Sequence, residues 1–280
     1  MLPGIILWGW SFCGAEDVIV PIVISLIFTL SCVGLLVCAL KERVSFFWAV
    51  LAGVFLVSIP IYTMHGTSQY ADVLLAYFIL ASSVLILDLF EAPLHNTAVL
   101  AGLFLGFAAC TKDNGIMATL LLSVLIIGRL RKTASLRVLI RPFGWGLTAV
   151  MVSVFLMKSF DALNVGNHTY DIFWSGLCAI QRWLLIGGFI GKSFTDSVWG
   201  LLWPLAFLVL LFCRGSLVQE GVRLVIKFML LYMIFYLFVY AGTVLELKWL
   251  LEVSWNRLLY LLAPTVVFVT FYALGKGKYR

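Results

Sequence analysis

Long apolar runs alternate with short polar segments along the chain. Nine runs have the length and composition of membrane spans, with ends good to a few residues: 18–40, 44–62, 73–90, 98–111, 115–128, 142–160, 197–213, 224–243 and 257–274. Barrel strands would alternate apolar and polar positions, and these runs do not. Helices satisfy their own backbone groups in lipid. The pattern therefore predicts an all-α polytopic transmembrane helix bundle of about nine spans.

Composition supports a chain without a soluble domain. Hydrophobic residues make up 63% of the 280 positions and charged residues 11%. A soluble domain is about 45–50% apolar and about 25% charged. The polar residues are too few to cover a water-facing surface, so residues 1–280 are predicted to form a single transmembrane domain.

The basic residues predict the orientation of the bundle. When the spans are counted, four basic segments fall on one face: Lys41 and Arg43; Arg129, Arg131, Lys132, Arg137 and Arg141; Arg214, Arg223 and Lys227; and Lys276, Lys278 and Arg280. The positive-inside rule makes this face cytoplasmic. We therefore expect a multi-pass protein of the cell membrane (plasma or inner), with the N-terminus outside and the C-terminus in the cytoplasm. The net charge of +6 reflects this topology, and no nucleic-acid partner is expected.

One segment leaves an alternative open. Residues 98–128 could form a single long helix, which would invert everything downstream and place Lys112 and Asp113 near the middle of the bilayer. Each charge there would cost roughly 2.5–3.5 kcal/mol. A break at Asn114-Gly115 avoids both problems, so two short spans are favoured. The longest exterior loop is then 161–196, in which the apolar stretch from Trp183 to Ile190 could form a helix lying on the membrane.

Three polar clusters are expected to meet at the exterior ends of the spans. They come from the loop 63–72, the break at 111–115 and the start of the last span. Their candidate ligand-binding residues are His65, Tyr70 and Asp72; Lys112, Asp113 and Asn114; and Arg257. Lys112 and Arg257 could bind one phosphate, as a point charge and a bidentate fork. His65, Tyr70, Asp72, Asp113 and Asn114 would line the cavity. An exterior polar cavity with two cations suits an anionic, lipid-linked ligand.

Each charged residue also has a structural explanation. Asp72 could stabilise a helix N-terminus, Lys112 could extend to the interface beside Asp113, and Arg257 could anchor the last span. Arg257 has no acidic residue in the next helical turn to neutralise it. The spacing of His, Cys and acidic residues supports no metal site, and no cofactor is expected.

Three motifs resemble a known family. The run from Gln69 through Asp72, the run Leu100–Gly115 ending in Thr-Lys-Asp-Asn-Gly, and the stretch Trp249–Pro264 are similar to segments of the bacterial relatives of protein mannosyltransferases. These are GT-C glycosyltransferases that use polyprenyl-phosphate sugars. The middle motif is the most specific, with Asp-Asn here in place of the family's Asn-Glu. The resemblance extends over essentially the whole chain in the family's order.

The resemblance implies a reaction and also a missing part. Lys112 and Arg257 would hold the phosphate of a polyprenyl-phosphate sugar, and a carboxylate would deprotonate the acceptor. The family's first helix and its exterior acidic loop, which carries the expected catalytic base, have no counterpart. Met1–Trp10 resembles the Leu-Pro stretch that follows that loop, and Glu16-Asp17 lies after it. The catalytic residue is therefore unassigned, and little transferase activity is expected from this chain alone.

Two other functions stay open. A lipid or small-molecule transporter or flippase would also need an exterior cavity and intramembrane charge, although transporters usually show paired repeats with matching broken helices. A non-catalytic membrane remnant is the other alternative. The expected partners are a polyprenyl-phosphate-linked sugar, membrane lipid and an upstream-encoded fragment that would supply the missing helix and loop.

Overall fold

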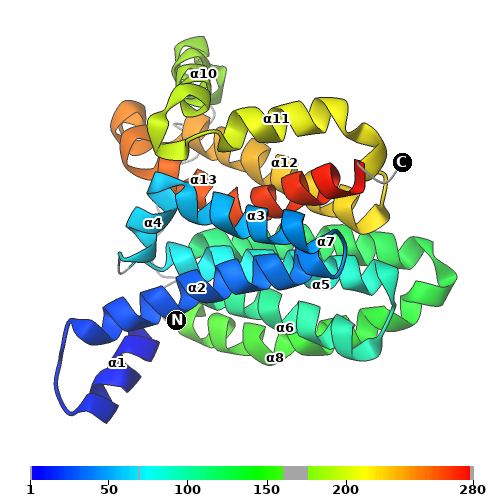
Figure 1. Ribbon diagram of the computed structural model, residues 1–280. Coiled ribbons are helices and arrows are strands. Elements are labelled where there is room, and N and C mark those ends of the chain that lie inside the picture. The colour runs from blue at the N-terminus through cyan, green and yellow to red at the C-terminus, as the bar shows by residue number, and fades with distance from the viewer. Residues whose placement is uncertain (1, 69, 160–175, 278–280) are drawn as a thin grey trace.

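The computed structural model describes residues 2–68, 70–159 and 176–277, and these residues form helices and no strand (Figure 1). The α-helices are α1 (Leu2–Cys13), α2 (Ile19–Lys41), α3 (Phe46–Ser58), α4 (Pro60–Gly66), α5 (Asp72–Glu91), α6 (His95–Thr111), α7 (Asp113–Lys132), α8 (Ile140–Ser159), α10 (Ile180–Thr195), α11 (Leu202–Phe212), α12 (Glu220–Gly242) and α13 (Leu247–Gly277). Three short 3-10 helices join them: η1 (Ala134–Leu139), η2 (Ser197–Trp199) and η3 (Arg214–Leu217).

The long apolar helices indicate a membrane-embedded protein and confirm the all-α fold class. Among the described helices, α2, α5, α7, α12 and α13 are long and apolar enough to cross a membrane. The pair α3 and α4 would make a sixth span if it is counted as one. Nine spans therefore remain a prediction, as does the orientation of the bundle.

The predicted span 44–62 is not straight. It consists of α3 and α4, which are bent by 73° relative to each other. Pro60 is the first residue of α4, and Ile59 before it has an extended backbone (φ −73°, ψ 115°). Proline disfavours helical geometry in the residue that precedes it and has no N–H to continue the helix. The bend follows from Pro60, which the hydrophobic pattern alone does not register.

The break between α6 and α7 confirms the two-helix interpretation of residues 98–128. A single residue, Lys112, separates the helices and has an extended backbone (φ −165°, ψ 162°). The helices form a hairpin in which the Thr119 hydroxyl donates to the carbonyl of Leu105 at 2.7 Å. A Cβ on Gly115 would lie 1.8 Å from the carbonyl oxygen of Ala108. Gly115 therefore allows α7 to approach α6 closely, and the break itself lies at Lys112.

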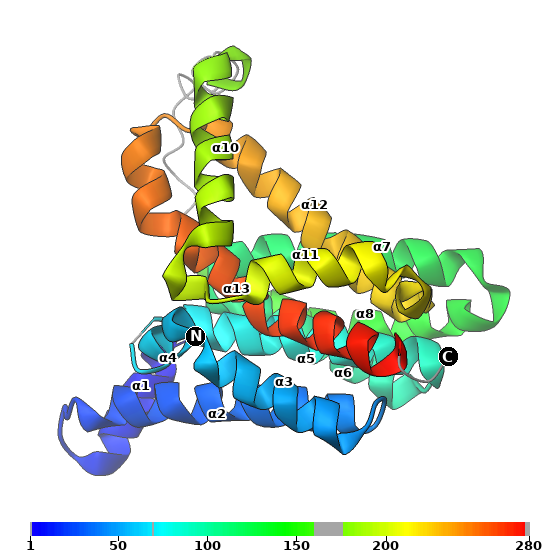
Figure 2. The same ribbon diagram turned by 45° about the horizontal axis from the view of Figure 1, so that its top comes forward.

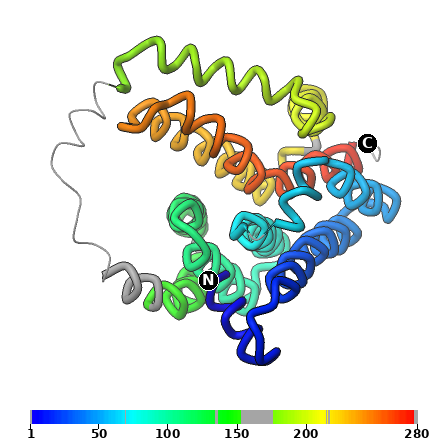
Figure 3. The backbone as a smooth tube through the Cα atoms, turned by 90° about the vertical axis from the view of Figure 1, so that its left-hand side faces the viewer, coloured from blue at the N-terminus to red at the C-terminus, as the bar shows by residue number. Residues whose placement is uncertain are grey.

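The centre of the bundle is formed by α13 and α5. The most apolar windows of these helices are 94% and 78% buried, against 28% for α2, whose apolar side chains face outward. A tight contact joins α6 to α8, where a Cβ on Gly102 would lie 2.2 Å from the carbonyl oxygen of Phe143. Small residues let transmembrane helices approach this closely. Figure 3 shows α2 to α8 gathered beside α11 to α13.

The helices run between two ends of the bundle. The end where α5 begins and α6 meets α7 is called the Asp72 end, and the end where α2 and α5 finish is called the Arg43 end (left and right in Figure 1). The described basic segments gather at the Arg43 end, as the sequence predicts. At the Asp72 end, α10 covers the stretch from Trp183 to Ile190 and confirms a helix there (Figure 2). Residues 161–175 of the predicted exterior loop, and Lys278 and Arg280, lie outside the described residues.

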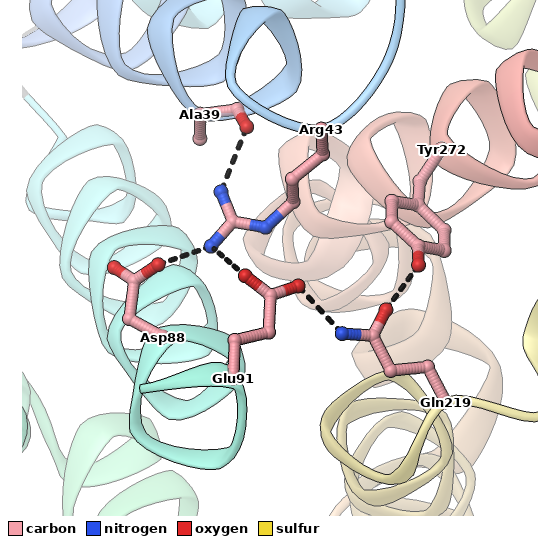
Figure 4. A network of polar contacts seen from close by, with 6 residues as sticks. All are labelled: Ala39, Arg43, Asp88, Glu91, Gln219 and Tyr272. Atoms are coloured by element: carbon pink, nitrogen blue, oxygen red, sulfur yellow. Dashed lines mark hydrogen bonds and ion pairs between the residues drawn. The ribbon is translucent and has the colours of Figure 1, made fainter. Parts of the chain in front are cut away.

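A network of hydrogen bonds and ion pairs connects several helices at the Arg43 end (Figure 4). Arg43, whose side chain is only 6% exposed, pairs with Asp88 and Glu91 of α5 and donates to the carbonyl of Ala39 at 2.8 Å. The network continues from Glu91 to Gln219, which donates to it at 2.5 Å, and from Gln219 to the hydroxyl of Tyr272 on α13. These contacts tie α2, α5, α13 and the segment before α12 together.

Candidate functional site

Asp72 is the centre of the candidate site. It is the first residue of α5, directly after the loop that follows α4, and its side chain is 1% exposed. A helix N-terminus favours a carboxylate because unpaired backbone N–H groups point toward it. This is the structural role that the sequence allows for Asp72, but a carboxylate buried so completely also needs cationic partners.

Lys112 and Arg257 supply those partners from two distant segments. The Nζ of Lys112, at the break between α6 and α7, lies 2.8 Å from Oδ1 of Asp72. The Nε of Arg257, on α13, lies 2.7 Å from Oδ2 of the same residue. Each carboxylate oxygen therefore takes one cation. The three polar clusters identified in the sequence do meet at one end of the bundle.

The shared carboxylate changes the interpretation of Arg257. Arg257 has no acidic residue in the next turn of its own helix, which favours a phosphate partner, but α5 provides Asp72. Two cations nevertheless share this one carboxylate, and their side chains remain 34% (Lys112) and 31% (Arg257) exposed. Arg257 uses only Nε, so both terminal nitrogens of its guanidinium have no partner among the described residues. The pair can still offer hydrogen-bond donors to an anion.

Aromatic rings position Arg257 from the other side. Its guanidinium carbon lies 4.4 Å from the centre of the Tyr70 ring, a cation–π contact. The His65 ring lies 5.5 Å from the Tyr70 ring and 5.1 Å from the Tyr260 ring. His65 and Tyr70 therefore lie near Arg257, with Tyr70 the more exposed of the two. Whether these two residues line a ligand cavity stays a prediction.

Asn114 has a structural role that the sequence did not reveal. Its side-chain oxygen accepts from the hydroxyl of Tyr236 at 2.9 Å, and its carbonyl accepts from Tyr232 at 3.3 Å. Both tyrosines lie on α12, which thereby holds the start of α7. Asp113, next to Lys112, is exposed. The recurrence of tyrosine at 232, 236 and 240, one per helical turn, was the signal that could have identified this polar face of α12.

The site has the chemistry of an anion-binding site. Its two cations have a fixed spacing because they share one carboxylate, and a guanidinium with free terminal nitrogens matches phosphate geometry. Among the residues that the structure describes, no group of three His, Cys, Asp or Glu side chains could hold a metal ion. Among the described carboxylates, none is assigned the role of general base.

Comparisons with known proteins identify no family for this chain. No protein-family model matches the chain, and no curated protein or solved structure is significantly similar to it.

Proposed function

We propose that this chain is a GT-C-like membrane glycosyltransferase module that binds a polyprenyl-phosphate-linked sugar at the Asp72 end. Lys112 and Arg257 hold the phosphate, Asp72 positions them, and the polyprenyl chain lies among the apolar helices. The acceptor would be sugar-modified on the exterior face, which is the Asp72 end under the topology that the basic residues favour. The catalytic base is not assigned.

One observation carries this proposal. Two cations from separate elements meet on a single buried carboxylate, and both keep exposed donors. If these residues formed only a structural ion pair, one cation would neutralise Asp72. A second cation would add an unpaired charge, which is costly inside the membrane. The second cation leaves an excess positive charge on these three residues. A phosphate monoester or diester supplies the missing negative charge and accepts the remaining hydrogen bonds.

Binding of a polyprenyl phosphate tests the proposal directly. The purified chain in detergent and its Lys112→Ala and Arg257→Ala variants are titrated with the phosphate. We expect each variant to bind at least about tenfold more weakly, because a hydrogen bond to a charged group is worth about 1.5–3 kcal/mol. Lys248→Ala removes an exposed cation from the first turns of α13 and is the matched control, with unchanged affinity expected. Equal affinity in all four proteins would sink the proposal.

A transporter of the same lipid-linked sugar is the second candidate. The observation that favours it is the 73° bend between α3 and α4, because discontinuous helices are common at transporter substrate sites. Reconstituted vesicles separate the two functions. Movement of a labelled polyprenyl-phosphate sugar across the bilayer, without release of the polyprenyl phosphate, would identify a transporter. Binding of the polyprenyl phosphate without movement of the labelled sugar across the bilayer would favour the glycosyltransferase module.

A further inference from the structure

A second cationic site lies at the opposite end of the bundle, in a groove between α7 and α12. The groove encloses about 460 Å³. Four basic side chains line it, and Glu220 is the one acidic residue among its lining residues; the basic residues are Arg129, Lys132, Arg223 and Lys227. The groove is separate from the Asp72 site, since α7 begins at that site and reaches the groove only in its last turns.

Membrane topology and helix dipoles explain why basic residues lie at this end, but they do not explain why basic residues from two helices line one groove. The positive-inside rule calls for basic residues at this end, and the C-terminus of α7 favours cations through its dipole. Neither effect requires cations from two different helices to face one cavity. Arg223 lies at the end of the first turn of α12, where the dipole disfavours positive charge, and Lys227 follows one turn later. Their clustering with Arg129 and Lys132 costs repulsion, which a bound anion would remove.

One ion pair joins the two helices that form the groove. Arg129 of α7 pairs with Glu220, the first residue of α12. The pair uses the only carboxylate that lines the groove, so three further cations are left without an acidic partner in its lining. The groove therefore carries an excess of positive charge.

Apolar side chains continue the groove along the helices. Val124, Leu125 and Leu224 line it together with Gly128. Gly128 has open space where a Cβ would be, so it widens the groove on the α7 side. The lining thus combines a cationic rim with an apolar wall, which is the arrangement that suits an amphiphile with an anionic head. Basic pockets between transmembrane helices commonly bind anionic lipid headgroups.

We propose that this groove binds a phosphate-bearing ligand, with the phosphate between Arg129, Lys132, Arg223 and Lys227. The chemistry is shared by an anionic phospholipid headgroup and by a free phosphate or pyrophosphate. The site does not depend on the glycosyltransferase proposal, because it involves none of the residues of the Asp72 site.

The test titrates the full chain in detergent with three probes: phosphatidylglycerol, phosphatidylcholine and inorganic pyrophosphate. Lipid adducts are counted by native mass spectrometry, and pyrophosphate binding is measured by calorimetry. Arg223→Gln with Lys227→Gln should weaken phosphatidylglycerol binding roughly 30-fold, at about five- to sixfold per surface cation. Lys41→Gln with Arg131→Gln removes two exposed cations from the same end outside the groove and is the matched control. Its affinity should change less than about twofold.

A substitution that is expected to strengthen binding serves as a control for misfolding, because a misfolded variant would bind more weakly. Glu220→Gln removes the only carboxylate of the groove and releases Arg129, so it should tighten phosphatidylglycerol binding severalfold. Binding of phosphatidylglycerol but not pyrophosphate would identify a lipid, and equal binding of both would identify a soluble phosphate compound. Either result supports the site. Equal loss in the groove and control variants, or phosphatidylcholine bound as tightly as phosphatidylglycerol, would overturn it.

Discussion

The charge clusters at the two ends of α5 have opposite arrangements of positive and negative residues. At its start, one buried carboxylate, Asp72, is shared by two cations whose side chains are about one-third exposed. At its end, one buried cation, Arg43, is shared by Asp88 and Glu91, whose side chains are 42% and 35% exposed. In both clusters the single charge is buried and the paired charges reach the surface.

The difference in sign separates a structural cluster from a binding site. At the Arg43 end, the exposed carboxylates meet water, and Glu91 is engaged further by Gln219. The network closes on Tyr272 and ties four segments of the chain together. At the Asp72 end, the exposed groups are cations with unused donors. A phosphate can complete that cluster, whereas the Arg43 cluster, with one cation and two carboxylates, would repel an anion.

The largest expected effect comes from the helix hairpin that positions Lys112. Gly115→Ala would place a methyl group 1.8 Å from the carbonyl oxygen of Ala108, so α7 must move away from α6. We expect a loss of more than about 3 kcal/mol of stability, measured by thermal unfolding in detergent. Gly128→Ala in the same helix meets open space and should change stability by less than about 1 kcal/mol. Similar losses in both variants would mean that the close approach at Gly115 does not hold the Asp72 end together.

Asp72→Asn should cost about 2 kcal/mol of stability. The loss is smaller than the about 3–5 kcal/mol typical of a fully buried pair, because Lys112 and Arg257 can reach water. If Asp72 served only the helix N-terminus, the loss would be about 0.3–1 kcal/mol. The same variant should bind polyprenyl phosphate more weakly than the wild type, since the cations lose the carboxylate that positions them. A stability loss with tighter binding would show that Asp72 competes with the phosphate for the cations and does not position them for binding.

Arg43→Gln should cost about 1.5 kcal/mol, because two charge-assisted contacts are lost while Asp88 and Glu91 stay partly hydrated. Unfolding in detergent measures the loss, and Lys41→Gln, which removes an exposed neighbouring cation, is the control. Polyprenyl-phosphate affinity should be unchanged in both variants. A change in that affinity would contradict the separation of the two ends.

The smallest effect is expected at Tyr70. Tyr70→Leu removes the ring over Arg257 and should weaken polyprenyl-phosphate binding about two- to fivefold, since an exposed cation–π contact is worth about 0.5–1 kcal/mol. Tyr70→Phe keeps the ring and should bind as the wild type does. If both variants lose affinity equally, the hydroxyl rather than the ring contributes.

The sequence by itself determined the helical class and the approximate positions of most long helices, although α13 begins at Leu247, ten residues before the predicted last span 257–274. Continuous apolar runs permit only helices in lipid, so the fold class followed from composition and periodicity. The charge cost of Lys112 and Asp113 at mid-bilayer predicted the break between α6 and α7. The sequence also contains the cause of the bend, Pro60, but a hydropathy pattern does not detect the effect of a single proline inside an apolar run.

Only the tertiary structure decided which charges meet. Lys112 lies 40 positions from Asp72 in the sequence, and Arg257 lies 185 positions from it. No local sequence pattern pairs these residues. Their contacts depend on how α5, α7 and α13 pack, and that packing depends on backbone approaches such as Gly115 against Ala108. The same holds for Arg129 and Glu220, which local patterns assign to separate loops. Helix formation in a membrane is a local property of the chain, whereas the pairing of buried charges is a property of the whole bundle, because it is fixed by shape complementarity between distant segments.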